Sequence, residues 1–133
     1  MKMAEVTSEL SYAKRQQVGA VIVKDTKILA TGYNGMPSGW ENACETVTEK
    51  GLLVSKPEVL HAETNAIAKI AQSTESSQDA TLFCTLAPCL QCAKLIYQSG
   101  IKTVYYKEKY HDESGLKFLE LSGVNVHQFD NSL

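Results

Sequence analysis

His61-Ala62-Glu63 and Pro88-Cys89-Leu90-Gln91-Cys92 each open a segment with helical periodicity, and the rest of the chain is arranged around them. Apolar residues recur at helical spacing after His61, and Pro88 stands near a first helical turn, where its missing N–H does no harm. Cys89 and Cys92 are three residues apart, so a helix places both side chains on one face. The two motifs therefore predict helices over residues 61–72 and 89–98, with polar side chains at their N-terminal ends.

Strands are predicted on both sides of these helices. The β-branched run at residues 18–23 predicts a buried strand, and a tight Asp25-Thr26 connection leads into an antiparallel strand at 27–33. Later strands are predicted at residues 81–85, 102–106 and 124–129, with a helix at 115–121. This alternation is typical of a layered α/β domain with a mixed sheet, whose parallel strands are joined by right-handed crossovers.

Two segments have less regular patterns. Residues 1–14 carry Met3, Val6, Leu10 and Ala13 at steps of three and four, which predicts a short amphipathic helix. Residues 34–58 are irregular and predict a long loop with room for one short helix. A loop of this length in a compact domain is usually functional or partly disordered.

The composition of the 133-residue chain is that of an ordinary globular protein, with 44% hydrophobic and 21% charged residues. A net charge of −2 disfavours the binding of long nucleic acid but leaves room for a small phosphorylated ligand. No apolar run is long enough for a membrane span, and the N-terminal residues lack a signal-peptide pattern, so a cytoplasmic location is expected. The four cysteines are then expected to be reduced, which favours metal binding by the Cys-x-x-Cys pair.

His61, Cys89 and Cys92 form a set of zinc ligands, namely one imidazole and two thiolates. A catalytic zinc keeps three protein ligands and leaves its fourth position to water, so Glu63 fits a proton shuttle better than a fourth ligand. The order of H-x-E and then P-C-x-x-C resembles the signature of zinc deaminases, and this resemblance implies a hydrolysis in which water replaces an exocyclic amine on a nucleobase. Glu63 takes a proton from the water, passes one to a ring nitrogen and then one to the leaving ammonia.

Two other interpretations of the cysteines stay open at this point. Cys89 and Cys92 fit a thioredoxin-like redox pair, or they belong to a structural zinc site with Cys44 or Cys84 as the fourth ligand. The presence of Glu63 in the right order upstream favours the catalytic interpretation over both.

The spacing of H-x-E and P-C-x-x-C resembles the signature of the cytidine deaminase superfamily. Further stretches resemble its deoxycytidylate (dCMP) deaminase family, in the compact bacterial and phage form. They span most of residues 18–112 and are Val18-Gly19-Ala20, Gly32-Tyr33-Asn34-Gly35-Met36-Pro37, Asn65-Ala66-Ile67, residues 92–101 and Tyr110-His111-Asp112.

The resemblance implies a three-layer α/β/α fold with a mixed five-stranded sheet, in a single domain over residues 1–133. It implies zinc-dependent conversion of dCMP to dUMP, which feeds thymidylate synthesis, with one catalytic zinc per chain. Members of that family are typically homohexamers, activated by dCTP with Mg²⁺ and inhibited by dTTP, so these are the expected partners. Long nucleic acid and membranes are not expected partners, and the host cytoplasm is the expected location if the chain is phage-encoded.

The resemblance also assigns residues of the pocket. Asn34 matches a residue that contacts the deoxyribose, Tyr110 one that contacts the substrate phosphate, and Ala62 and Asn65 are expected to line the pocket. Some members carry an Arg for the phosphate where this chain has Gln72, so the phosphate clamp is expected to differ. Contacts to an effector nucleotide are expected at Arg15, Gly35 and Pro37.

Several alternatives remain open from the residues alone. Asn34-Gly35 is also the strongest dipeptide for a tight turn, and Trp40 fits either an interface anchor or a nucleotide cover.

Three alternative functions also stay open: a deaminase of other cytosine nucleotides or nucleosides, a tRNA adenosine deaminase, and a non-catalytic zinc module. The acidic balance speaks against tRNA, and Glu63 speaks against the module. Residues 45–60 contain no His or Cys that would join Cys44 in a second zinc site.

Overall fold

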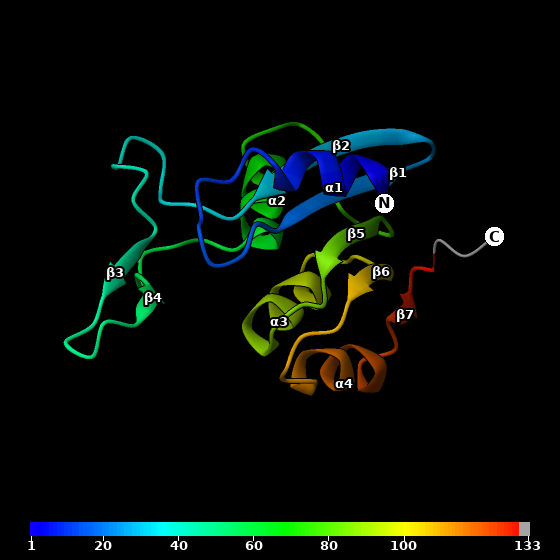
Figure 1. Ribbon diagram of the computed structural model, residues 1–133. Helices are drawn as coiled ribbons and strands as arrows, with labels where there is room; N and C mark the ends of the chain where they lie inside the picture. The colour runs from blue at the N-terminus through cyan, green and yellow to red at the C-terminus, as the bar shows by residue number, and fades with distance from the viewer. Residues whose placement is uncertain (131–133) are drawn as a thin grey trace.

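The computed structural model describes residues 1–130 and has a five-stranded sheet in the order β2-β1-β5-β6-β7 (Figure 1). β1 (Gly19–Lys24) pairs antiparallel with both β2 (Lys27–Tyr33) and β5 (Thr81–Leu86). β6 (Thr103–Glu108) and β7 (Asn125–Gln128) continue the sheet in parallel. The predicted mixed sheet is confirmed, while the last three residues of the predicted domain lie outside the described part of the chain.

The tight connection between β1 and β2 is also confirmed. Asp25 and Thr26 have φ values of 50° and 64°. Positive φ at both central residues is the backbone of the two-residue hairpin turn whose twist matches that of the flanking strands.

The helices lie in two layers, one on each face of the sheet. α2 (Ala62–Ala71) joins the parallel strands β2 and β5, and α3 (Leu90–Gln98) and α4 (Ser114–Leu121) join β5 to β6 and β6 to β7. Right-handed crossovers that step in one direction along a sheet place their helices on one face. The remaining helix, α1 (Lys2–Ser8), packs on the opposite face, so the predicted three-layer α/β/α arrangement is confirmed (Figure 1).

α1 differs from its prediction in length and in the face that it buries. It ends at Ser8 instead of reaching Lys14, and Met3 and Val6 are 53% and 58% exposed. The helix turns Ala4 toward the sheet because its backbone lies directly on β1: a Cβ on Gly19 would be 2.0 Å from the Ala4 carbonyl oxygen. Only small residues permit this close approach, so the larger apolar side chains are left on the outer side.

The long loop contains a β-hairpin instead of the predicted short helix. β3 (Glu45–Val47) and β4 (Leu53–Ser55) pair antiparallel and form a separate two-stranded sheet. Figure 1 shows this hairpin set apart from the five-stranded sheet. Its strands are three residues long and expose Val47, Leu53 and Val54, so they carry none of the inward-facing alternation that predicts a strand.

The hydrophobic core lies between the sheet and the layer of α2, α3 and α4. Alternate residues of the central strands point into it and meet the apolar faces of the helices. Its largest fully buried aliphatic side chains are Ile22, Leu82, Ile96, Val104 and Leu119. Among the described residues, every helix is too short or too polar to cross a bilayer.

Candidate metal centre and its cavity

The N-terminal ends of α2 and α3 meet beside the core and carry the predicted ligands. His61 is the N-cap of α2 and Cys89 the N-cap of α3, both in extended backbone conformation, and Cys92 lies in the first turn of α3. The backbone N–H of Cys92 donates to Cys89 Sγ at 3.5 Å. The N-terminal ends of both helices are therefore directed at one place, where their dipoles favour negative charge.

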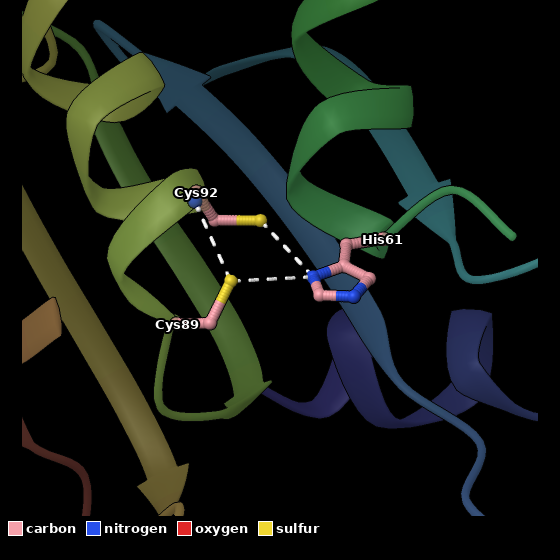
Figure 2. Close-up of side chains that lie close together, drawn as sticks. All are labelled: His61, Cys89 and Cys92. Carbon is pink, nitrogen blue, oxygen red and sulfur yellow. Dashed lines mark hydrogen bonds between the residues drawn. The ribbon is translucent and has the colours of Figure 1, made fainter. Parts of the chain in front are cut away.

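The three ligand atoms are arranged as a tetrahedral metal site requires. His61 Nδ1 lies 3.3 Å from Cys92 Sγ and 3.5 Å from Cys89 Sγ, as Figure 2 shows. In a tetrahedral zinc site, nitrogen and sulfur ligands are about 3.5 Å apart, given the usual zinc–ligand bond lengths. The group contains one His and two Cys, with all ligand atoms within 4.8 Å of one another. These residues thus fit zinc, and the predicted convergence of the three is confirmed.

The electrostatics of the group favour a thiolate. Hydrogen bonds from Cys92 and from His61 lower the pKa of the Cys89 thiol to about 4. The hydrogen bond with Cys89, and then burial, raise the pKa of Cys92, while the hydrogen bond to Cys89 raises the pKa of His61. Thiolate is the form of cysteine that binds metals, so Cys89 is prepared for this role at neutral pH.

Glu63 is buried beside the ligands, in the first turn of α2. Its side chain is 4% exposed, and burial raises the pKa of its carboxyl. It lines a cavity of about 440 Å³ together with His61, Ala62 and Cys89. A carboxyl whose pKa is moved toward neutrality can both take up and release a proton, which is the property of a general acid–base.

Two glycines allow the elements that carry the site to pack closely, and the sequence analysis did not identify either role. A Cβ on Gly32 of β2 would lie 2.3 Å from the Ala62 carbonyl oxygen, and a Cβ on Gly115 of α4 would lie 2.1 Å from the Pro88 carbonyl oxygen. Both contacts are with backbone, which has no flexible end to move aside. Gly32 therefore seats the first turn of α2, and Gly115 seats the turn that carries Cys89. A glycine inside a predicted strand, as at Gly32, is a sequence signal of close backbone approach.

Of the four predicted substrate-binding residues, three lie in the cavity wall. Asn34, Ala62 and Tyr110 line the cavity. Asn34 also ties the loop after β2 to the segment before β1, since its side-chain amide binds the backbone of Gln16 and Val18, both at 2.8 Å. Asn65 is absent from the cavity wall; its Nδ2 donates to the Tyr33 carbonyl oxygen at 2.8 Å and ties α2 to β2. The predicted contact of Asn65 with the substrate stays a prediction.

Arg15 lies in the same cavity as Glu63, and its predicted contact with an effector nucleotide stays a prediction. Lys56 and His111 line this cavity as well, and neither was singled out for it in the sequence analysis. The His111 ring packs against that of Tyr110, with centroids 4.1 Å apart. Gln72 is the C-cap of α2, about 15 Å along the helix from the metal ligands. The positive charges at the cavity thus come from the loops and not from the end of α2.

Two predicted effector residues, Gly35 and Pro37, are not part of the cavity wall. The backbone N–H of Gly35 donates to the Leu60 carbonyl oxygen at 3.0 Å, and its own carbonyl accepts from Leu60 N–H at 2.8 Å. This pair of bonds joins the loop after β2 to the residue that precedes His61. Their predicted contact with an effector stays a prediction.

The other two cysteines differ in their surroundings: Cys44 lines the same cavity as His61 and Cys89, and Cys84 is buried in the hydrophobic core. Cys44 Sγ donates to the Asn42 carbonyl oxygen at 3.5 Å, and Cys84 Sγ donates to that of Tyr105 at 3.6 Å. Burial raises the pKa of Cys84 well above that of a free thiol, so it stays protonated. Neither belongs to the group of His61, Cys89 and Cys92, which argues against a closed, four-ligand structural zinc.

Sequence and structure matches agree with this site. Residues 1–108 match the model of the cytidine and deoxycytidylate deaminase zinc-binding region. A dCMP deaminase from the cyanophage S-TIM5, solved in complex with dCMP and dUMP, shares 46% identity and a TM-score of 0.90 over 96% of this chain and 92% of that one.

Two curated relatives extend the match. The deoxycytidylate deaminase of Enterobacteria phage T4 is 34% identical over 83% of this chain and 76% of its own length. That of Saccharomyces cerevisiae is 36% identical over 97% of this chain, which spans only 43% of the yeast protein. With the family model covering residues 1–108 and with zinc-type ligands converging beside a buried glutamate, the chain belongs to the family of cytidine and deoxycytidylate deaminases.

Proposed function

We propose that the chain hydrolyses the exocyclic amine of dCMP to give dUMP and ammonia, and so supplies a precursor of thymidylate. The observation that carries the proposal is the position of buried Glu63 in one cavity with His61 and Cys89. The cavity volume of about 440 Å³ suits a mononucleotide. The bound dCMP and dUMP of the cyanophage relative support the same substrate.

In this proposal, His61, Cys89 and Cys92 hold one zinc per chain. Zinc bound there supplies the Lewis acidity that makes water nucleophilic near neutral pH. Glu63 accepts a proton from the attacking water, delivers one to the ring nitrogen next to the reacting carbon and then one to the departing amine. One water is consumed, and the carbon–nitrogen bond to the exocyclic amine breaks, so the products are dUMP and ammonia.

A substrate panel tests the proposal directly. Ammonia release is measured with dCMP, dCTP, CMP, deoxycytidine and a tRNA carrying the adenosine substrate of tRNA deaminases. We expect dCMP to have the highest kcat/KM. Turnover of another member of the panel without turnover of dCMP would refute the assignment of the substrate.

Arg15 is the residue that we propose for the substrate phosphate, with Tyr110 beside the same cavity. Guanidinium groups suit phosphate because their donors match its oxygens in pairs. Arg15→Gln should raise the KM for dCMP by about 10-fold to 100-fold, the equivalent of one charge-assisted hydrogen bond or more. Deoxycytidine, which has no phosphate, should be turned over as by the wild type. Lys14→Gln, in the same segment but outside the cavity wall, is the matched control.

Thr64 is expected to strengthen zinc binding at the metal site. Its Oγ1 lies 3.8 Å from Cys92 Sγ, and it follows Glu63 on α2. A hydroxyl that donates to a thiolate ligand holds its orientation, and loss of such a partner typically costs about 10-fold to 100-fold in metal affinity. Thr64→Val should weaken zinc binding by about tenfold in a chelator competition, and Thr64→Ser should restore it. Equal zinc affinity in all three proteins would contradict this role.

We also propose a homohexamer that is activated by dCTP with Mg²⁺ and inhibited by dTTP, with Gly35 and Pro37 near the effector. Exposed apolar side chains on and just after α1 support self-association; they are Met3, Val6, Leu10 and Tyr12. The cytoplasm is the proposed location, since it keeps the four cysteines reduced.

Regulation and assembly have simple tests. Addition of dCTP with Mg²⁺ should shift the dCMP saturation curve to lower concentration, and dTTP should shift it to higher concentration. Sedimentation should give six times the chain mass. Curves that neither nucleotide moves, or a monomer at every concentration, would rule out the corresponding proposal.

A further inference from the structure

We infer that the base of the β3–β4 hairpin positions Arg15 in the cavity, and that Glu45 is the positioning residue through which it acts. The inference rests on the proposed role of Arg15 at the substrate phosphate. It gives the loop of residues 34–58 a function in substrate specificity: the hairpin sets how well the site takes a phosphorylated substrate and leaves the deamination chemistry unchanged.

Glu45 holds the backbone on which Arg15 is carried. Its Oε2 accepts hydrogen bonds from the backbone N–H of Lys14 at 2.8 Å and of Arg15 at 3.0 Å. Hydrogen bonds to an ionised acceptor are stronger than those between neutral groups. One carboxylate oxygen therefore fixes two successive peptide units, and with them the direction in which the Arg15 side chain leaves the backbone.

Ser55 holds the other end of the same side chain. Arg15 Nη1 donates to Ser55 Oγ at 3.3 Å. Glu45 and Ser55 are directly opposite each other in the register of the hairpin. A single cross-strand pair thus contacts both the backbone and the guanidinium of Arg15, and all three residues line the cavity that contains Glu63.

The segment that carries Arg15 depends on such contacts because it lies between α1 and β1 and has no helix or strand of its own. On its C-terminal side, Asn34 binds Gln16 and Val18 through both ends of its amide. On its N-terminal side, Glu45 is the acceptor. Ser11 Oγ, further toward α1, donates to the Asn34 carbonyl oxygen at 2.8 Å. Removal of Glu45 leaves these other contacts in place, so Arg15 should remain near the cavity with less defined orientation.

A purely structural role for Glu45 would predict a lower melting temperature and equal losses for dCMP and deoxycytidine when Glu45 is replaced. Its contacts are solvent-exposed, and exposed polar contacts contribute little to stability, so the fold should not depend on them. Loss of position at a substrate-binding group, by contrast, acts on substrate affinity, and only on substrates that carry the phosphate.

The test compares dCMP with deoxycytidine in Glu45→Ala, Glu45→Gln and the control Glu49→Ala, which changes an exposed residue between the two hairpin strands. Glu45→Ala should raise the KM for dCMP about tenfold with kcat within about twofold, and leave kcat/KM for deoxycytidine and the melting temperature unchanged. Glu45→Gln keeps an oxygen acceptor and should restore most of the affinity. Calorimetric binding of dCMP in a Glu63→Gln background gives the same comparison without turnover.

The double variant Arg15→Gln/Glu45→Ala separates this inference from the proposal on which it rests. If Glu45 acts through Arg15, the double variant should be no worse for dCMP than Arg15→Gln alone. Additive losses, equal losses for dCMP and deoxycytidine, or a Glu45→Ala protein that matches Glu49→Ala would overturn the inference. If Arg15→Gln itself fails to distinguish dCMP from deoxycytidine, it is the phosphate role of Arg15 that is refuted.

Discussion

Replacement of Glu63 by Gln is expected to lower kcat for dCMP by at least about 10²-fold, or roughly 2.7 kcal/mol of activation free energy, while about one zinc per chain remains bound. Gln has the shape of Glu but cannot take up or release a proton. Glu63 is buried in the cavity wall, yet it is not a member of the metal-binding group. The substitution should therefore remove the proton shuttle without removing a ligand. Ammonia release gives kcat, and atomic emission gives the zinc content.

Zinc content decides between the roles that Glu63 can have. Glu49→Gln, on the exposed turn of the β3–β4 hairpin, serves as the control and should match the wild type in both measurements. If Glu63→Gln loses zinc in proportion to its activity, Glu63 acts on the metal and not on protons. If it keeps both zinc and activity, the proposed proton transfer is wrong.

The metal site was predictable from sequence because its geometry is local. Cys89 and Cys92 are three residues apart at a helix start, and His61 begins another helix, so helical periodicity alone directs all three side chains to helix N-termini. β1 was predictable because it is dense in β-branched residues and buried over most of its length. The N-terminal ends of the two helices must also meet in space. Right-handed crossovers favour this because they place α2 and α3 on the same face of the sheet.

The surroundings of the site were less predictable because they depend on contacts between distant segments. Arg15 reaches the cavity through Glu45, 30 residues further along the chain, and no periodicity reports such a contact. Asn65 occupies the expected helix but faces the Tyr33 carbonyl, which only the packing of α2 on β2 determines. The apolar pattern of residues 1–14 predicted an inward face, whereas the close approach of α1 to Gly19 selects the small residue Ala4. Sequence periodicity reports which residues share a face and leaves open which face is buried.

Replacement of Cys92 by Ala is expected to abolish zinc binding under mild chelation and to lower turnover by about 10³-fold or more, since two protein ligands do not retain a catalytic zinc. Cys92 is 3% exposed, and its Sγ lies 3.3 Å from His61 Nδ1 as one of the three ligand atoms of the metal-binding group. Zinc per chain after dialysis against a chelator and ammonia release from dCMP measure the two effects.

Cys84→Ala is the matched control for this prediction, because it also removes a buried thiol from the core. Cys84 is 0% exposed, its Sγ donates to the Tyr105 carbonyl oxygen, and it is not a member of the metal-binding group. The variant should lose stability, by roughly 1–3 kcal/mol for the cavity and the lost hydrogen bond, and still bind one zinc per chain. A Cys84→Ala protein without zinc, or a Cys92→Ala protein that retains it, would mean that the ligands are not the three residues at the helix N-termini. The two variants remove the same atom from the same core, so a difference in zinc content isolates the contribution of the Cys92 position from the general cost of a lost buried thiol.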